Sequence, residues 1–324
     1  MQTLVTGGSG FIGQYLVTAL LQQGRRVRIL DVRPPAHVQS GIEFLKGSVL
    51  DPATVREAVA GIDEVYHLAA FPGMWLPRKD DFHAINCRGT EAVIAAVRDS
   101  KVKRLLHCST ESILFGRSLE KAFVAAETWT TTDEMPGPYT RSKLIAEQRA
   151  FEAAASGLSV VIANPTIPIG LTQSATPPTL MLQHFVSRRL QLYFDFMLNL
   201  VDVRDVAAGL LLVMQRGQDG QRYVLGGENL PLRKLLEIVA TISGREAMRI
   251  PVSAGFAQCA AIACEFVADH VTRRPPCATL EGVRIARRSK PVSIDKSRKE
   301  LGYAPRPIKP ALESVISSIL NPSP

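Results

Sequence analysis

Tyr139 and Lys143 stand four positions apart in the stretch PYTRSK, which is typical of the start of a helix. Side chains four residues apart on a helix lie one turn apart on the same face. A phenol has a pKa of about 10, so by itself it exchanges protons poorly near neutral pH. A neighbouring ammonium group and the positive end of a helix both stabilise the phenolate and lower that pKa. The pair is therefore a candidate for moving a proton to or from a substrate hydroxyl or carbonyl.

Three hydroxyl side chains, Ser109, Thr110 and Ser112, follow the apolar run at the start of LLHCSTES. If that run is a strand of a parallel sheet, its carboxyl end lies at the edge where such folds bind their ligands. A hydroxyl there can hold a substrate oxygen beside Tyr139. Tyrosine and lysine also meet by chance on helix surfaces, and hydroxyls often cap strand ends. Both features therefore depend on the fold that would bring them together.

The stretch TGGSGFIG provides the first part of that fold, with Gly7, Gly10 and Gly13 at intervals of three between a predicted strand and a predicted helix. The first glycine permits a tight turn, the second lets a pyrophosphate approach the backbone, and the third lets helix and strand pack closely. The N-terminus of the helix then directs free N–H groups and a positive dipole end at the phosphates.

Asp31 ends the second predicted strand, where a carboxylate can accept hydrogen bonds from an adenosine ribose. Glycines and acid together predict a dinucleotide site. A carboxylate at this point repels a 2′-phosphate, which favours NAD. Arg33 lies two residues later and softens that preference, so NADP stays open.

Short apolar runs alternate with helical patterns through the first half of the chain. The expected strands are residues 3–7, 26–31, 42–47, 64–70, 103–109 and 158–164, and the expected helices are residues 11–23, 52–60, 80–99 and 139–155. Alternation at this spacing predicts an α/β fold of the Rossmann type, a doubly wound parallel sheet with helices on both faces.

The regular alternation of predicted strands and helices ends after Asn164, where the proline-rich stretch NPTIPIGLTQSATPPTL predicts a loop. A strand-like run, a helix and a second strand over residues 198–226 could then return the chain to the sheet. We therefore expect an NAD(P)-binding Rossmann domain of residues 1–165 with 198–226. Residues 166–197 and 227–324 are expected to form a smaller, mainly helical substrate-binding domain.

The composition excludes several other classes of protein. Of 324 residues, 46% are hydrophobic and 21% charged, which is ordinary for a globular protein. The formal charge of +8 comes from basic residues scattered along the chain, so no nucleic-acid partner is expected. The five cysteines form no CxxC pair, which predicts reduced thiols and neither a zinc site nor a disulfide framework. His67 and His107 fall in apolar runs and are expected in the core, so no metal is predicted.

Met1 leads almost directly into the glycine stretch, which leaves no room for a signal peptide and predicts a cytoplasmic protein. The most apolar later segment, residues 254–269, is too short to span a bilayer, which takes about 20 apolar residues. A buried helix is the first interpretation of that segment. The alternative is a helix that lines an apolar pocket or touches a membrane surface.

These motifs together identify a family resemblance. On TGGSGFIG, Asp31, HLAA (67–70), NCRGT (86–90), HCST, YTRSK and NPTIPIG, the chain resembles the extended short-chain dehydrogenase/reductase (NAD-dependent epimerase/dehydratase) family over essentially its whole length. The resemblance implies that Thr110, Tyr139 and Lys143 form the catalytic set. Ser109 competes for the hydroxyl role, and alignment to the family's motif favours Thr110. It also implies a homodimer that pairs the helices expected at 80–99 and 139–155.

The resemblance further implies a set of residues around the cofactor. Those expected to bind it are Gly7, Gly10, Phe11, Ile12, Gly13, Asp31, Arg33, Ser48, Val49, Leu68, Ala69, Ala70, Asn86, Ser109, Tyr139, Lys143 and Pro165. The family often has Gly-Asp-Leu after the third strand, whereas this chain has GSVLD. Ser48 therefore replaces an acid near the adenine, and either its hydroxyl or the Val49 backbone would serve instead.

A missing arginine–aspartate pair indicates which kind of substrate the chain binds. Family members that act on nucleotide sugars commonly carry Arg-Asp where this chain has Leu198 and Asn199, so a bidentate grip on a diphosphate is missing there. The chain is more similar to the 3β-hydroxysteroid dehydrogenase and dihydroflavonol-reductase-like branch. The residues expected at the substrate are Phe71, Trp75, Glu111 and Thr166. Further apolar candidates for the pocket or the core are Met74, Leu114, Phe115, Tyr193, Phe194, Phe196 and Met197.

The expected function is therefore an NAD(P)-dependent oxidoreductase that interconverts a secondary alcohol and a ketone on an apolar, steroid-, flavonoid-, polyketide- or β-keto-acyl-like small molecule. One alternative is a sugar epimerase or dehydratase that retains its NAD, and Glu111 next to Thr110 adds to it, although a surface position for Glu111 is the first expectation. A second alternative is a dinucleotide-binding protein without catalysis.

Overall fold

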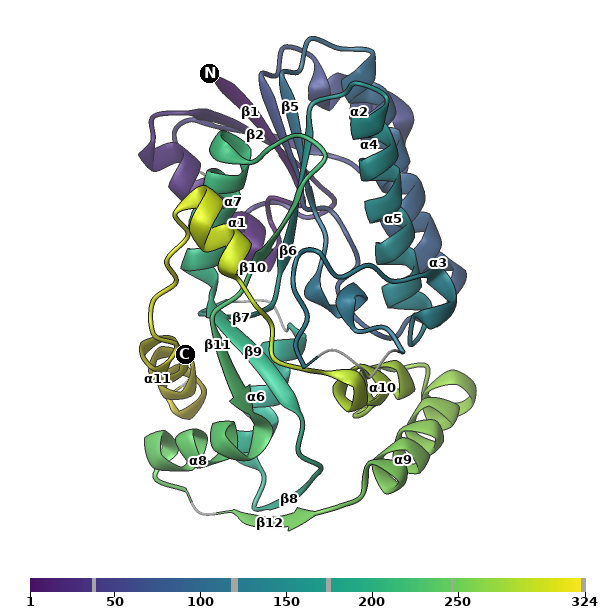
Figure 1. Cartoon of the computed structure of the whole chain (residues 1–324), viewed down its shortest axis with the longest axis vertical. Helices are drawn as coiled ribbons and strands as arrows, with labels where there is room; N and C mark the ends of the chain where they lie inside the picture. Colours follow the sequence, from purple (N-terminus) through teal and green to yellow (C-terminus); the bar gives the residue numbers. More distant parts are fainter. Residues whose placement is uncertain (37–38, 118–121, 173–175, 246, 322–324) are drawn as a thin grey trace.

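A seven-stranded parallel sheet forms the centre of the computed structural model, which describes residues 1–36, 39–117, 122–172, 176–245 and 247–321 (Figure 1). Its strands are β1 (Gln2–Thr6), β2 (Arg26–Asp31), β3 (Ile42–Lys46), β4 (Glu64–His67), β5 (Arg104–Cys108), β6 (Val160–Pro165) and β10 (Arg222–Leu225). They lie in the order β3-β2-β1-β4-β5-β6-β10. The order reverses between β1 and β4, and such a switch point leaves a crevice at the carboxyl ends of the strands.

Helices cover both faces of this sheet. On one face lie α1 (Phe11–Gln22) and α7 (Val203–Arg216), and on the other lie α2 (Pro52–Val59), α4 (Gly89–Arg98) and α5 (Pro138–Ala155). Successive side chains of a strand point to opposite faces, so Val5 joins the apolar core under α1 and α7 while Leu4 joins the core under α2, α4 and α5. The predicted Rossmann-type doubly wound sheet is confirmed.

The helix expected at residues 80–99 is continuous in space but not uniform. It consists of α3 (Asp80–Phe82), the π-helical turn η1 (His83–Arg88) and α4. π-Helical turns are rare and often occur at functional sites. This one contains Asn86, whose side chain is buried.

The second part of the molecule contains two small sheets as well as helices. β7 (Ile167–Ile169), β9 (Met197–Asp202) and β11 (Glu228–Pro231) form one sheet, and β8 (Leu190–Tyr193) pairs with β12 (Met248–Pro251) in the other. The expectation that the strand after residue 197 joins the large sheet is wrong, because β9 pairs with β7 and β11. Only β10 returns to the large sheet, beside β6.

Helices complete this second part. They are α6 (Pro177–Ser187), α8 (Leu232–Ser243), α9 (Ala254–Val267) with its π-helical continuation η4 (Ala268–Thr272), α10 (Leu280–Arg288) and α11 (Lys309–Leu320). α6, α8 and α11 share a separate apolar core. α9 and α10 lie apart from it, below the N-terminal end of α5 (Figure 1).

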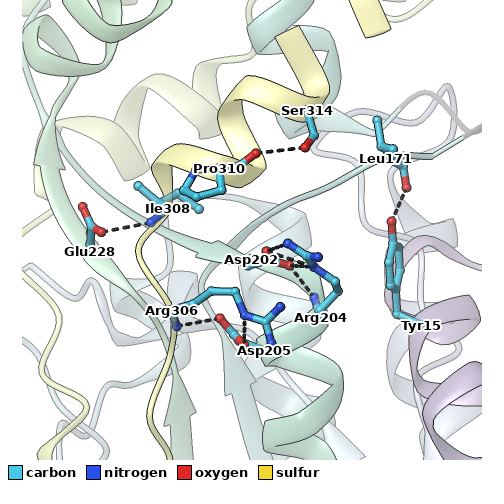
Figure 2. Close-up of polar contacts among 10 residues, drawn as sticks. All are labelled: Tyr15, Leu171, Asp202, Arg204, Asp205, Glu228, Arg306, Ile308, Pro310 and Ser314. Carbon is cyan, nitrogen blue, oxygen red and sulfur yellow. Dashed lines mark hydrogen bonds and ion pairs between the residues drawn. The ribbon is translucent and has the colours of Figure 1, made fainter. Parts of the chain in front are cut away.

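Polar contacts fasten the C-terminal segment to α7 and β11 (Figure 2). Asp202 caps α7 by accepting a hydrogen bond from the Arg204 backbone N–H at 2.8 Å. Asp205 accepts one from the Arg306 backbone N–H at 2.8 Å and forms an ion pair with its guanidinium at 2.9 Å. Just before it, the turn η5 (Ser297–Leu301) packs against the core of the first part through Leu301. Part of the segment expected in the substrate domain therefore supports the Rossmann part.

Candidate active site

The glycine turn has the geometry that an anion site needs. Gly7 adopts φ +73°, and a Cβ there would lie 2.7 Å from the Ala69 nitrogen. A Cβ at Gly13 would lie 2.3 Å from the Gly7 carbonyl oxygen, so packing alone demands both glycines. Gly10 differs, because its φ of −77° suits any residue and its Cβ would meet only the Gly7 oxygen, at 3.1 Å. Packing therefore constrains position 10 less than positions 7 and 13, and a glycine there would also let a ligand pass close over the turn.

The N-terminus of α1 is also suited to an anion. Its N-cap residue Gly10 supplies no capping side chain, and no acidic residue stands in the first turn, which contains Phe11 and Ile12. The free N–H groups and the positive dipole end are thus left for a negatively charged ligand. These residues fit a pyrophosphate.

Asp31 at the end of β2 faces this turn. Its Oδ2 accepts a hydrogen bond from the Ser9 backbone N–H, and its Oδ1 accepts one from the Arg33 backbone N–H, each 3.1 Å long. The carboxylate is half-buried and held in place, and its remaining lone pairs can accept from ribose hydroxyls. The Arg33 side chain is exposed.

Loops after β3 and β4 form the neighbouring edge of the crevice. Leu68, Ala69 and Ala70 follow β4 and are half-buried, and the Leu68 N–H donates to the Thr6 carbonyl at 3.0 Å. Ser48 uses its hydroxyl oxygen to accept from the Leu50 N–H at 3.1 Å, which shapes the turn before α2. The roles of Ser48 and of the buried Val49 at an adenine stay predictions.

Asn86 connects the β4 loop to the helix that carries the tyrosine. Its Oδ1 accepts a hydrogen bond from the Phe71 N–H at 2.8 Å, and its Nδ2 donates to the Ser142 hydroxyl at 2.9 Å. Both contacts are within the protein, so Asn86 fixes the loop after β4 relative to α5. Sequence reasoning did not find Ser142, since its partner is 56 residues away.

Thr110 and Glu111 lie side by side at the end of β5. The Thr110 hydroxyl caps the short 3₁₀ turn η2 (Glu111–Leu114) and donates to Glu111 Oε2 at 3.0 Å. The surface position expected for Glu111 is wrong, because this side chain is buried. Burial raises the pKa of the Glu111 carboxyl to about 7. A surface acid would not have that property.

Tyr139 lies in the first turn of α5, with its buried phenol close enough to the Thr110 hydroxyl for that group to favour the phenolate. Burial, and after it the negative charge of Glu111, raises the pKa of Tyr139. The predicted lowering of that pKa is therefore wrong for the chain's own groups. Lys143 does lie one turn along α5, but its Nζ donates to the Cys108 carbonyl at 2.9 Å. Burial in turn lowers the pKa of Lys143.

Glu281 is a site residue that the sequence did not reveal. From α10, its carboxylate accepts hydrogen bonds from the backbone N–H groups of Tyr139 at 3.1 Å and Thr140 at 2.7 Å. It therefore occupies the N-terminal end of α5, where a negative charge is favoured by the helix dipole. No local pattern predicts a cap that comes from 142 residues away.

Two buried hydroxyls at neighbouring strand ends lack partners. Ser109 Oγ, after β5, and Thr166 Oγ1, after Pro165 at the end of β6, have no hydrogen-bond partner among the described residues. Unpaired buried polar groups are uncommon and call for a ligand or a water molecule. Both therefore remain candidates to bind polar atoms of a cofactor or substrate.

The aromatic candidates divide between the site and the core. Phe71 contacts Phe82 edge to face at a ring distance of 5.6 Å, and Phe82 lies 6.3 Å from the Tyr139 ring. Trp75 is buried and donates from its indole N–H to Asp269 Oδ1 at 2.7 Å, which ties the loop after β4 to η4. Leu114 and Phe115 instead belong to the core under α1 and α7.

The remaining apolar candidates lie at the second part's core and rim. Tyr193 and Phe196 pack against the core of α6, α8 and α11, and Phe194 lies 5.3 Å from Phe196. Met74 and Met197 are half-buried. A cavity of about 320 Å³ lies elsewhere, between Phe123 and η5, and none of the site residues above lines it.

His67 and His107 are core residues, as expected. Both are buried, and burial lowers the pKa of His67 to about 3. Leu198 is also buried in a core, and Asn199 bonds to Asn229 at 2.9 Å and to Gly227 at 2.8 Å. Neither residue offers a charge to a diphosphate.

The described part of the chain contains neither a candidate metal cluster nor a helix that could span a membrane. No group of three or more His, Cys, Asp or Glu side chains there could hold a metal ion. None of its helices has the length and apolar character needed to cross a bilayer.

Comparison with known proteins agrees with this geometry. The sequence model of the NAD-dependent epimerase/dehydratase family matches residues 3–226. A Synechocystis sp. protein named provisionally as a dihydroflavonol 4-reductase is 31% identical, with 98% of this chain and 94% of that protein covered. The 4-hydroxy-2-methyl-3-oxo-4-farnesyl-3,4-dihydroquinoline-1-oxide ketoreductase of Stigmatella aurantiaca is 32% identical, with 94% and 92% covered.

A solved structure shows the same fold with a cofactor bound. The UDP-glucose 4-epimerase of Thermus thermophilus, in complex with NAD, has a TM-score of 0.78 with 22% identity, and the match covers 100% of each chain. This likeness concerns the fold.

Proposed function

The chain belongs to the NAD-dependent epimerase/dehydratase family, in its extended short-chain dehydrogenase/reductase branch, with NAD as its cofactor, and on this premise we propose that it reduces a ketone of an apolar substrate to a secondary alcohol, or catalyses the reverse oxidation. The observation that carries the proposal is the proximity of Thr110 and Tyr139 at the carboxyl edge of the sheet that also carries the glycine turn. Gly7, Gly10, Gly13 and the N-terminus of α1 would hold the pyrophosphate, and Asp31 the ribose. When bound, NADH supplies the hydride.

In this proposal Thr110 and Tyr139 act on the substrate oxygen. The Thr110 hydroxyl orients that oxygen, and the Tyr139 phenol gives it a proton as negative charge develops on it. Lys143 is held at the strand end by Cys108, and its positive charge favours negative charge nearby. Asn86 and Glu281 hold the loop and the helix that carry these groups.

The raised pKa of Tyr139 fits the role of proton donor in ketone reduction near neutral pH. A phenol with a raised pKa stays protonated at neutral pH and is thus ready to donate. It still donates readily to an alkoxide, which is a far stronger base. Oxidation needs the phenolate instead, and is therefore expected to require a higher pH.

An apolar substrate is supported by residues on both sides of the site. The half-buried Phe71 packs on the fully buried Phe82, which in turn contacts the Tyr139 ring, so apolar side chains lie next to the phenol. Leu198 and Asn199 are used in packing and in sheet contacts, where the related nucleotide-sugar enzymes commonly carry an Arg-Asp pair. The farnesyl-quinoline ketoreductase to which the chain is similar points in the same direction.

The experiment measures NADH consumption by the full chain with ketosteroids, flavanonols, β-keto acyl compounds and UDP- or dTDP-sugars. Oxidation of NADH by one of the apolar ketones supports the proposal. Turnover restricted to the nucleotide sugars would contradict it. NADPH is run in parallel, and weaker activity with it is expected because Asp31 repels a 2′-phosphate.

A sugar epimerase or dehydratase that retains NAD is the second candidate, and one observation favours it. Glu111 is buried beside Thr110 with a pKa of about 7, which suits an acid–base group near neutral pH. The two candidates differ in cofactor balance. Product formation without net change in NADH would support the second one.

Dimerisation and a cytoplasmic location remain predictions. α4 and α5 lie side by side, joined by an ion pair of 3.0 Å between Glu91 and Arg149 at their exposed sides. We propose that these two helices pair with the same helices of a second copy.

A further inference from the structure

α9 and η4 expose large apolar side chains to solvent, which is the reverse of what an ordinary surface helix does. Five of their large exposed side chains are apolar, namely Phe256, Ile262, Phe266, Val267 and Val271. The exposed His270 stacks on Phe266 with ring centroids 4.4 Å apart. Phe266 is 61% exposed and Val271 71%. The small residues Cys259, Ala260 and Ala263 are exposed between them. The first interpretation of residues 254–269 as a buried helix is therefore wrong, because only Ala261 of α9 is buried.

Three polar side chains of the same segment, Gln258, Glu265 and Asp269, lie on the side that faces the protein, whereas His270 and Thr272 are exposed. Glu265 lies near Lys79 and Arg284, and Gln258 accepts a hydrogen bond from Arg287. Asp269 accepts from Trp75 at 2.7 Å and pairs with Lys79 at 3.1 Å. A helix that faced only water would point these groups outward.

The β8/β12 sheet carries a second exposed apolar surface, and β12 directly precedes α9 in sequence. β12 ends two residues before the N-cap of α9, and it pairs with β8 so that Leu190 lies opposite Met248 and Leu192 opposite Ile250. All four side chains are exposed, so they form one uncovered face of the two-stranded sheet. β8, β12 and α9 lie at the same end of the molecule (Figure 1).

Basic residues border both surfaces. Arg188 and Arg189 directly precede β8, and Arg273 and Arg274 directly follow η4, and all four are exposed. In residues 188–195 and 247–274 the acids are Asp195, which pairs with Arg233, Glu265, which lies near Lys79 and Arg284, and Asp269, which pairs with Lys79. The surface therefore offers apolar side chains and four arginines, while its acids each lie beside another cation.

We propose that α9, η4 and the β8/β12 sheet form a membrane face that docks on the surface of a bilayer containing anionic lipids. Apolar side chains of such a face enter the boundary between headgroups and acyl chains, and arginines bind the anionic headgroups. Continuous exposed apolar surfaces are rare on monomers that remain in water. A second copy of the chain fits less well, because the acids of the same face already lie beside other cations.

The test is co-sedimentation of the full chain with vesicles of phosphatidylcholine plus phosphatidylglycerol, and with vesicles of phosphatidylcholine alone. We expect binding to the anionic vesicles, weakened by salt and at least tenfold weaker without phosphatidylglycerol. The double variant F266S/V271S should lose at least tenfold in binding, and R273Q/R274Q should lose most of the salt dependence. F123S removes an exposed aromatic ring from a different surface and should bind as the wild type does.

NAD binding by each variant is measured alongside and should be unchanged, because the substituted side chains are exposed. Three results would overturn the proposal. The first is that the wild type stays in the supernatant with anionic vesicles, and the second is that F266S/V271S binds to them as well as F123S does. The third is that the wild type is a dimer without lipid and that the same apolar substitutions make it a monomer. The last result would assign the face to a second copy. None of these readouts depends on the proposed reaction.

Discussion

Glu281 and Tyr139 are joined by a hydrogen bond of 3.1 Å from the Tyr139 backbone N–H to the Glu281 carboxylate, across 142 residues of sequence. The contact links α10 of the second part to the first turn of α5. It places a buried negative charge near the phenol, and that charge contributes to raising the pKa of Tyr139. The second part of the molecule therefore influences the proton donor directly.

Replacing this carboxylate should change the pH dependence of the reaction as well as its rate. In E281Q the negative charge is removed, so the pKa of Tyr139 falls. Alcohol oxidation needs the phenolate, whose fraction at a given alkaline pH increases as that pKa falls, so the rising limb of the kcat profile for oxidation should move to lower pH. We also expect kcat to fall about tenfold, because an amide accepts fewer hydrogen bonds at the end of α5.

The matched control is E313Q on the exposed side of α11, which should match the wild-type profile. A purely structural role for Glu281 would reduce stability and leave the position of the limb unchanged.

Glu111 should make stability depend on pH in the range between its unfolded and folded pKa values. Its folded pKa of about 7 lies above the ordinary value of 4.5, so between these two pH values the folded state binds more protons than the unfolded state. The free energy of unfolding must therefore fall as pH rises from 4.5 to 7. Urea unfolding at pH 5 and at pH 8 should show a smaller loss in E111Q than in the wild type. Equal losses in the two proteins would contradict the buried, raised-pKa carboxyl.

Alanine substitutions of Gly10 and Gly13 should affect different quantities, the Kd for NAD in the first case and the free energy of unfolding in the second. In G13A the new Cβ would lie 2.3 Å from the Gly7 oxygen, so we expect about 1–3 kcal/mol less unfolding free energy. G10A meets only one protein atom, at 3.1 Å, so its stability should change little while its Kd for NAD rises at least tenfold. Calorimetric NAD titration and urea unfolding measure the two quantities. NAD binding by G10A at wild-type strength would show that no phosphate passes over this turn.

A buried ion pair beneath the site should matter for stability alone. Arg222 Nη1 lies 2.6 Å from Glu147 Oε1, with both side chains buried, and its other nitrogens donate to the carbonyls of Ala126 and Thr128. R222M leaves the Glu147 charge without its partner and should cost about 3–5 kcal/mol of unfolding free energy. R204M removes a guanidinium that is half exposed and should cost about 1 kcal/mol or less.

The first half of the fold was predictable because its signals are local. Apolar runs, glycine turns and helix starts each lie within a few residues, and the structure places the strands and helices within a few positions of the expected bounds. Tyr139, Lys143 and Thr110 could be found for the same reason, through short motifs at strand and helix ends.

Other features depend on contacts between distant segments, which no single stretch of sequence reveals. Glu281 reaches α5 from the far end of the chain, and β9 joins a small sheet because β7 and β11 flank it. Burial of Glu111 follows from its place in the turn η2, and burial of Tyr139 itself, followed by the charge of Glu111, raises the pKa of Tyr139. The outward apolar face of α9 has a periodicity that fits a buried helix equally well.

The most direct test of the central claim compares Y139F with the wild type on the apolar ketone that the substrate screen identifies. With NADH binding measured in the same preparations, we predict that Y139F binds NADH within twofold of the wild type and that kcat falls by at least 100-fold. Y193F, at a half-buried tyrosine against the core of the second part, should keep wild-type kcat. Full turnover by Y139F with normal NADH binding would contradict the account.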